Sequence, residues 1–212
     1  MCRGLSGKRL RRDSGGRELR RVHPIEAESY RRLRELVDLS HLEPLSDAVA
    51  ERVIHASADL EYAESLVFEE AVLEGAVGAL RRKVPVVTDV GMVAAGITAC
   101  ETSCFVSDPR ARALSERLDI SRSAAGIRVA VGEVGEGAIW VIGNAPTALF
   151  ELLELGVQPT LVVGLPVGFV GATESKKALI ESGLPAITNR GPKGGSAVAA
   201  AALNALIYYE ED

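Results

Sequence analysis

His55 is the side chain best suited to proton transfer in the stretch 51-ERVIHASADLEYA-63, and it is one of only three histidines in 212 residues. The unperturbed pKa of histidine lies near physiological pH, so this imidazole can act as an acid or a base. If the stretch is helical, Glu51 and Asp59 lie four residues either side of His55 and share its face. A carboxylate there would favour the imidazolium form. The alternative for His55 is a buried ring with a satisfied hydrogen bond. The alternative for Glu51 and Asp59 is that both are simply solvated.

Familiar motifs for nucleotides, metals and nucleophiles are not matched elsewhere in the sequence. The glycines of 164-GLPVGFVGA-172 are spaced four and then three apart, which is not G-x-G-x-x-G, and 191-GPKGGS-196 does not fit G-x-x-x-x-G-K-[ST]. Cys100 and Cys104 lie four apart with no histidine nearby, so we expect no bound metal. There is also no convincing Ser-His-Asp or Cys-His arrangement. These observations disfavour nucleotide, zinc and covalent chemistry.

Basic residues stand close to several turns, in a chain whose formal net charge is −5. They are Arg122, Lys176, Arg190 and Lys193. Asn144 is a candidate N-cap with Pro146 just inside the helix, and Ser196 lies near the start of the last helix. Helix amino ends attract carboxylates as well as phosphates. We therefore expect a polyanionic ligand that local charges hold on an acidic protein.

Alternating hydrophobic segments predict the elements that position these residues. Continuous apolar runs predict buried strands at 84–88, 104–107, 138–142, 160–163 and 185–188. Helical periodicity predicts helices at 25–39, after Ser46 or Asp47, and at about 69–82, 110–118, 122–132, 145–155, 173–182 and 194–207. The alternation predicts an α/β fold of three layers, doubly wound, with a mostly parallel sheet of about five strands, helices on both faces and an N-terminal helical segment.

Turn residues concentrate after each predicted strand, at the carboxyl edge of the sheet. Open α/β sheets bind ligands at that edge, and five such turns, three of them glycine-rich, favour a ligand site there. The alternative is that strand-to-helix turns need Gly, Asp, Asn and Pro in any case. Asp89 and Asp108 are therefore expected to be turn caps, and Trp140 is expected in the core. His23 and His41 lie beside prolines or turn residues, where we expect them to be exposed.

The chain is long enough for one domain with a substantial core, which we place at residues 23–212. Residues 1–22 hold eight Lys or Arg and two Asp or Glu, a charge of +6 that leaves −11 for the remainder. We expect a disordered basic arm; a nucleic-acid-binding arm is the alternative, disfavoured by its lack of aromatics and by the acidic body. Without a secretory apolar region or a run of membrane-spanning length, and with few scattered cysteines, we expect a cytoplasmic protein with no nucleic-acid or membrane partner.

Six blocks follow one another along residues 23 to 209. They are 25-IEAES-29, 52-RVIHASAD-59, 121-SRSAAG-126, 143-GNAPTALFELLE-154, 165-LPVGFVGATESK-176 and 190-RGPKGGSAVAAAALNAL-206. Together they resemble the precorrin-8X methylmutase family, and chance similarity across six ordered blocks is improbable. The first two blocks are closer to the cobalt-precorrin-8 branch than to the oxygen-dependent branch.

The resemblance implies an isomerase of corrin-ring biosynthesis that moves a methyl group from C-11 to C-12 of the macrocycle, giving cobyrinic or hydrogenobyrinic acid. It implies no cofactor, since any cobalt comes with the tetrapyrrole substrate, and a homodimer with sites at or near the subunit interface. His55 matches the family's histidine, Arg122 the arginine of the R-S-A-A block, and Ser29 the serine near the start of the first helix. Glu26 stands where another member has tyrosine, so its position carries no assigned role. An acid at His55 would make the receiving carbon more electron-poor.

Such a substrate carries several acetate and propionate groups around a flat, apolar centre. Arg122 can bind one carboxylate bidentately. We expect the ring to lie against Val167, Phe169 and Val170, unless these three are ordinary core. The expected substrate-binding residues are Ser29, Arg122, Ser123, Asn144, Pro166, Gly168, Phe169, Lys176, Arg190, Lys193 and Gly194, with His55 as the catalytic acid and no metal site.

Two rival functions stay open at this point. A tetrapyrrole carrier would keep the pocket without catalysis. A nucleotide-dependent oxidoreductase would use the doubly wound sheet, but the missing glycine fingerprint counts against it.

Overall fold

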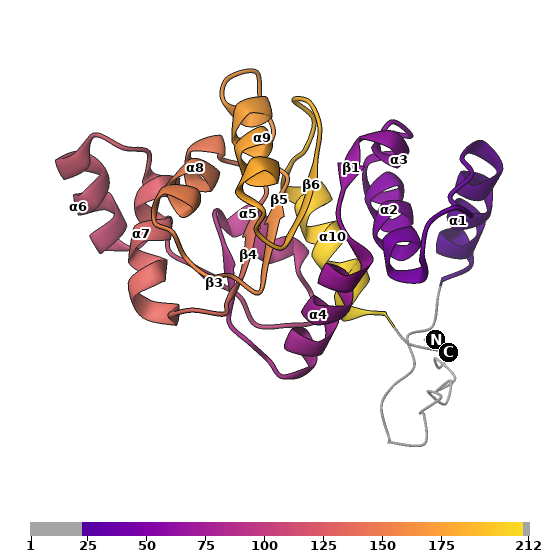
Figure 1. The fold of residues 1–212 in the computed structure, drawn as a ribbon, viewed down its shortest axis with the longest axis horizontal. Coiled ribbons are helices and arrows are strands. Elements are labelled where there is room, and N and C mark those ends of the chain that lie inside the picture. Colours follow the sequence, from indigo (N-terminus) through magenta and orange to yellow (C-terminus); the bar gives the residue numbers. More distant parts are fainter. Residues whose placement is uncertain (1–22, 210–212) are drawn as a thin grey trace, which may run out of the picture.

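A single six-stranded sheet organises residues 23–209, the part of the chain that the computed structural model describes (Figure 1). The strands are β1 (Leu66–Val67), β2 (Val86–Thr88), β3 (Ser103–Cys104), β4 (Ile139–Ile142), β5 (Leu161–Gly164) and β6 (Ala186–Asn189). Their order is β1-β6-β5-β4-β2-β3. β1 pairs antiparallel with β6, and the other neighbours pair in parallel. The predicted basic arm, residues 1–22, lies outside the described residues.

Helices cover both faces of the sheet, which confirms the predicted α/β fold (Figure 1). One face carries α2 (Pro44–Ser57), α4 (Glu70–Arg81), α5 (Gly91–Gly96) and α10 (Ser196–Ile207). The other carries α7 (Arg122–Val134), α8 (Pro146–Glu154) and α9 (Ala172–Ser182). At the two ends, α6 (Pro109–Leu118) packs on α7, and α1 (Pro24–Leu36) packs on α2 beside α3 (Tyr62–Ser65). None of the described helices is long and apolar enough to cross a membrane.

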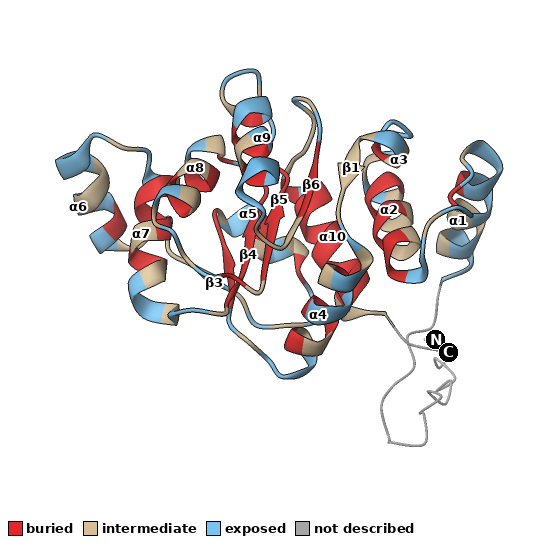
Figure 2. Cartoon of the chain, viewed as in Figure 1, coloured by how far each residue is buried: buried red, intermediate tan, exposed pale blue. Residues whose placement is uncertain are grey.

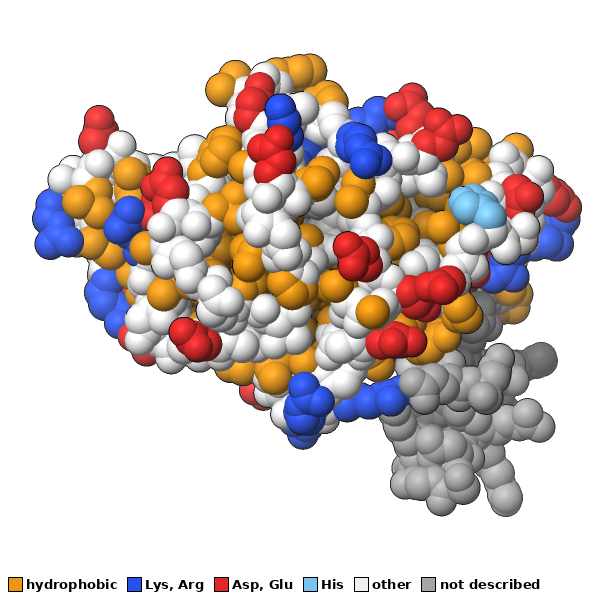
Figure 3. Space-filling view, viewed as in Figure 1, with side chains coloured by type: hydrophobic (Ala, Val, Ile, Leu, Met, Phe, Trp, Pro, Cys, Tyr) orange, Lys and Arg blue, Asp and Glu red, His pale blue; other side chains and the backbone are white. Residues whose placement is uncertain are grey.

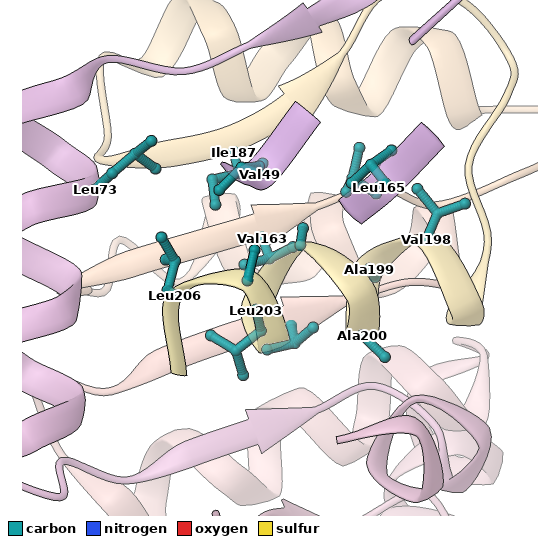
Figure 4. Close-up of a cluster of buried hydrophobic side chains, with 14 of the residues drawn as sticks. Val49, Leu73, Val163, Leu165, Ile187, Val198, Ala199, Ala200, Leu203 and Leu206 are labelled. Carbon is teal, nitrogen blue, oxygen red and sulfur yellow. The ribbon is translucent and has the colours of Figure 1, made fainter. Parts of the chain in front are cut away.

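The core is built around α10, which lies between the sheet and α2. A helix that is apolar on every side must be buried on every side, and α10 is buried along nearly its whole length (Figure 2). Figure 4 shows Leu203 and Leu206 of α10 in one cluster with Val163 of β5 and Leu73 of α4. Trp140 is also fully buried, on the opposite face of the sheet, which confirms its predicted core position.

Short elements and one cap account for the departures from the predicted fold. β1, α3 and α5 were not predicted, because segments of two, four and six residues are too short to display a repeat. The cap predicted for the second helix at Ser46 or Asp47 is wrong, since α2 already begins at Pro44. Glu70 of α4 satisfies its amino end instead: its carboxylate accepts the N–H groups of Leu45 and Ser46, both at 2.8 Å.

Candidate active site

His55 lies in the last turn of α2, half-buried against α1. Its Nδ1 is 3.0 Å from the hydroxyl oxygen of Ser29. The ring stacks on Tyr30, with centroids 4.5 Å apart and an interplanar angle of 24°. Two neighbouring residues of α1, Ser29 and Tyr30, therefore hold the imidazole in one orientation.

The two carboxylates expected beside His55 are bound elsewhere, so that interpretation is wrong. Glu51 accepts hydrogen bonds from the guanidinium of Arg34, at 2.5 and 3.1 Å. Asp59 is not on the helix, because α2 ends at Ser57 and Ala58 turns the chain in the left-handed region. The Asp59 carboxylate accepts a 2.6 Å hydrogen bond from Lys193, which lowers its pKa below the usual range. Contacts with Arg34 of α1 and with Lys193 of the loop after β6, rather than the four-residue spacing, determine which groups Glu51 and Asp59 bind.

Two glycine-rich loops at the carboxyl edge of the sheet form one unit, the paired loops 165–171 and 189–195. Gly195 donates its N–H to the Leu165 carbonyl at 2.9 Å, and Gly168 donates to the Pro192 carbonyl at 3.2 Å. A side chain at Gly194 would overlap the Leu165 and Pro166 carbonyl oxygens, so only glycine permits this approach. Of the predicted site residues, Pro166, Gly168 and Gly194 thus shape these loops.

The tip of loop 165–171 presents apolar side chains to solvent. Phe169 is 102% exposed and Val170 88%, with Val167 less so. The alternative that these three are ordinary core is therefore wrong. Figure 3 shows hydrophobic side chains at the top of the molecule, over the loop between β5 and α9. Exposed apolar groups of this size are available to an apolar ligand or to a second protein surface.

The basic residues of this edge play different parts. The Lys193 ammonium bridges Asp59 at 2.6 Å and Glu61 at 2.8 Å, tying the paired loops to the turn after α2. Both carboxylates raise the pKa of Lys193. Arg190 is exposed on the same loop, whereas Lys176 of α9 is only 1% exposed and faces protein. Figure 3 shows basic and acidic side chains side by side over the β6–α10 loop and α3.

Arg122, Ser123 and Asn144 lie elsewhere, around the starts of α7 and α8. Arg122 is exposed at the first position of α7, where Ser121 caps the helix and hydrogen-bonds the Thr147 hydroxyl at 2.6 Å. Figure 1 places α7 toward the end of the molecule opposite α1 and α2. One copy of the chain therefore does not bring Arg122 next to His55.

The topological switch point between β2 and β4, a usual ligand crevice in doubly wound sheets, is filled from within. Asp89 accepts the N–H groups of Gly143, Asn144 and Ala145 at 3.1, 2.9 and 2.8 Å. Burial nevertheless raises the pKa of Asp89. Asp89 is thus the turn cap that was predicted, whereas Asn144 does not cap α8: Ala145 holds that position, without a side-chain bond.

Smaller predictions are also settled by the structure. Asp108 caps α6, and both His23 and His41 are exposed, as expected. A cavity of about 1030 Å³ opens at the amino ends of β2 and β3, opposite the paired loops, and none of the candidate site residues lines it. Among the described residues there is no group of three His, Cys, Asp or Glu side chains that could hold a metal ion, and the expectation of no metal stays a prediction.

Sequence reasoning missed Tyr30, Glu61 and Asn189. Tyr30 directly follows Ser29, so a helix that presents one to His55 readily presents the other, and this neighbourhood was the available signal. Asn189 is a fully buried amide at the end of β6, where the glycine-rich loop begins. Glu61 carried no signal, because its ion pair with Lys193 depends on how α3 is placed.

Known proteins place this chain in a family. The family model for precorrin-8X methylmutase (CbiC) matches residues 24–209. A cobalt-precorrin-8 methylmutase from Methanothermobacter thermautotrophicus is 42% identical over 90% of this chain and 94% of its own length. A precorrin-8X methylmutase from Sinorhizobium sp is 39% identical, over 89% and 95%. The crystal structure of the precorrin-8X methylmutase from Thermus thermophilus superposes with a TM-score of 0.78 at 34% identity, covering 86% of this chain and 93% of that one. The chain belongs to the precorrin-8X methylmutase family of cobalamin-biosynthesis isomerases.

Proposed function

We propose that this isomerase moves a methyl group from C-11 to C-12 of precorrin-8X or cobalt-precorrin-8, with His55 as the acid. The observation that carries the proposal is the oriented imidazole of His55. It lies one turn before Asp59, which binds Lys193 of the paired loops. An acid, a cation and an apolar loop tip thus share one edge of the sheet.

The hydrogen bond between Ser29 and Nδ1 of His55 leaves Nε2 as the ring nitrogen that can meet the substrate. If the Ser29 hydroxyl donates to Nδ1, the neutral imidazole carries its hydrogen on Nε2. Among the described residues, no side chain is hydrogen-bonded to Nε2, so this nitrogen can donate to the macrocycle. Donation to a ring nitrogen or a peripheral carbonyl withdraws electrons from the conjugated system and favours migration toward an electron-poor carbon. No covalent bond to the protein is needed.

The edge around His55 also matches the shape and charge of a tetrapyrrole. Its peripheral carboxylates suit Lys193 and Arg190, which extend from loop 189–195. Its flat centre suits Phe169 and Val170, which loop 165–171 holds in solvent. Substrate carboxylates would join or replace Asp59 and Glu61 on the Lys193 ammonium.

We further propose a homodimer in which Arg122 of one copy serves the site of the other. The support is geometric: Arg122 begins α7 and His55 lies in the last turn of α2, and these two helices pack on opposite faces of the sheet, toward opposite ends of the molecule (Figure 1). Mixing His55→Ala and Arg122→Ala proteins tests this arrangement. Random re-pairing gives one intact site per mixed dimer, and so about a quarter of the wild-type activity. Each variant alone should be nearly inactive, and a mixture as inactive as its components would contradict a shared site.

Conversion of substrate is the direct test of the function. Wild-type protein is incubated anaerobically with cobalt-precorrin-8 and, in parallel, with precorrin-8X, while the visible spectrum is followed. We expect His55→Ala to lower kcat by about 10²- to 10⁴-fold, the usual contribution of a general acid, while His41→Ala, an exposed histidine, retains full activity. Equal rates for wild type and His55→Ala would remove His55 as the acid. Binding without conversion by either protein would favour a carrier.

We also propose that the reaction needs no cofactor of the protein's own and takes place in the cytoplasm. A neutral isomerisation consumes no electrons, and the few scattered cysteines suit a reducing compartment. If the rate of precorrin-8X conversion is unchanged after exhaustive dialysis against a chelator, that result would support a reaction without a metal cofactor. Activity that returns only on addition of a metal would contradict it.

A further inference from the structure

Lys176 is a buried ammonium beside the proposed site. It projects from the second turn of α9, is 1% exposed and ranks among the largest fully buried side chains of the described chain. Burying an ammonium is unfavourable unless hydrogen bonds or an opposite charge compensate it. The arrangement around Lys176 therefore calls for a physical reason.

Its hydrogen bonds all lead to loop 189–195. Nζ donates to the Asn189 side-chain oxygen at 2.9 Å and to the Lys193 carbonyl at 2.5 Å. The Asn189 amide in turn donates to the carbonyls of Lys193 and Arg190, at 3.1 and 3.2 Å. These contacts fasten the end of β6 to the carbonyls of Arg190 and Lys193, within a loop that lacks regular secondary structure after Asn189.

No opposite charge accompanies these hydrogen bonds. Within residues 23–209, no carboxylate forms an ion pair with Lys176, and burial alone lowers its pKa, to about 8. A neutral amide donor would avoid the desolvation penalty of an ammonium. What an amide cannot supply is a positive charge in a region of low dielectric, where its attraction for an anion is strong.

We propose that Lys176 is a positioning residue with an electrostatic role: it fixes loop 189–195 and adds an uncompensated positive charge behind the surface that receives the substrate carboxylates. This inference rests on the proposed function. The carboxylates of the bound macrocycle would supply the opposite charge that the protein itself does not place beside Lys176. Lys193, in contrast, already has Asp59 and Glu61.

The charge on Lys176 also predicts a pH dependence. Above about pH 8 the folded protein loses this proton, so KM for the polyanionic substrate should rise while Lys193, whose pKa is raised, stays charged. Over the same pH range, the stability of the folded protein should increase while its affinity for the substrate falls. Between pH 8 and the unfolded value of 10.5, the unfolded chain binds the extra proton, so the free energy of unfolding rises with pH. The charged groups on the elements around Lys176 are Glu174, Lys177 and Glu181 of α9, Glu151 and Glu154 of α8, and Arg190 and Lys193 of the loop.

Three substitutions separate the hydrogen bonds from the charge. Lys176→Gln keeps a donor and removes the charge, Lys176→Met removes both, and Lys176→Arg keeps the charge. We expect Lys176→Gln to raise KM about ten-fold at pH 7, with kcat within two-fold of wild type, and to abolish the rise of KM above pH 8. Lys176→Met should raise KM in the same way and should also lower Tm, because both hydrogen bonds are lost. Lys176→Arg, if it folds, should keep a KM close to that of the wild type.

The outcomes are distinguishable from failure of the proposed function itself. If wild-type protein converts neither precorrin, the function fails and KM has no meaning. If wild type is active and Lys176→Gln shares its KM and its pH profile, Lys176 is structural only and the inference is overturned. Should Lys176→Gln not fold, the wild-type profile decides: a KM that stays flat from pH 7 to 9 also overturns it.

Discussion

Two strand ends of this sheet bury a charge, and they satisfy it in opposite ways. After β2 and β4, the Asp89 carboxylate accepts three backbone N–H groups that would otherwise suit an anionic ligand. After β6, the Lys176 ammonium donates to an amide and a carbonyl and keeps its positive charge unmatched within the described residues. The first end is closed by the protein, and the second is where we propose that the substrate carboxylates bind.

This difference refines the general rule for doubly wound sheets. That rule directs attention to the switch point, where crossover connections diverge. Here a side chain at Gly143 would collide with Val93 and Ala199, so the switch point is packed solid as well as electrostatically saturated. The site that we propose lies further along the same edge, toward β6 and the end of α2.

The largest change in stability is expected at the closed end. Asp89→Ala leaves three buried N–H groups unpaired and should lower the free energy of unfolding by roughly 3 kcal/mol or more. Asp108→Ala is the matched control, because it removes one N-cap bond and an exposed ion pair with Arg110, and it should cost about 1 kcal/mol. Urea unfolding of both variants measures the gap. Equal losses would show that the Asp89 cluster is no stronger than an ordinary cap.

An intermediate effect is expected where the paired loops touch. Gly194→Ala forces a methyl group against the Leu165 and Pro166 carbonyls and should cost about 1–3 kcal/mol of stability, with a raised KM because the loops separate. Gly75→Ala serves as control: its added methyl group meets nothing within 4 Å, and alanine in a helix should stabilise by about 0.5–1 kcal/mol. A Gly194→Ala protein with unchanged stability and KM would mean that loop contact is not required.

The smallest effect is expected at Glu51. Its ion pair with Arg34 is largely open to solvent on the arginine side, so Glu51→Gln should change stability by less than about 1 kcal/mol. The kcat should stay at the wild-type value, since Glu51 does not contact His55. A drop in kcat approaching that of His55→Ala would instead restore Glu51 as the group that sets the charge of the imidazole.

Periodicity in the sequence predicted what repeats along the chain, and little of what depends on contacts between elements. Four strands follow from apolar runs and the longer helices from helical periodicity. The strand predicted at 104–107 overlaps β3 only at Cys104, and β1 is defined by two pairings with β6. The sequence was enough to predict that His55 and the loop glycines are candidate site residues. Their partners were not predictable: Asp59 turned to Lys193 because α2 ends two residues earlier. Ser29 reached His55 only because α1 packs across α2.

The position of α10 has a consequence for how the protein is made. This helix fills the centre of the core, yet it is the last of the described elements to be synthesised. Before residues 196–207 are synthesised, the apolar groups of α2 and the sheet that pack on α10 have no such partner. Since loop 189–195 leads directly into α10, the candidate site can take shape only when the core closes. Nascent chains should therefore depend on protection from aggregation until late in synthesis.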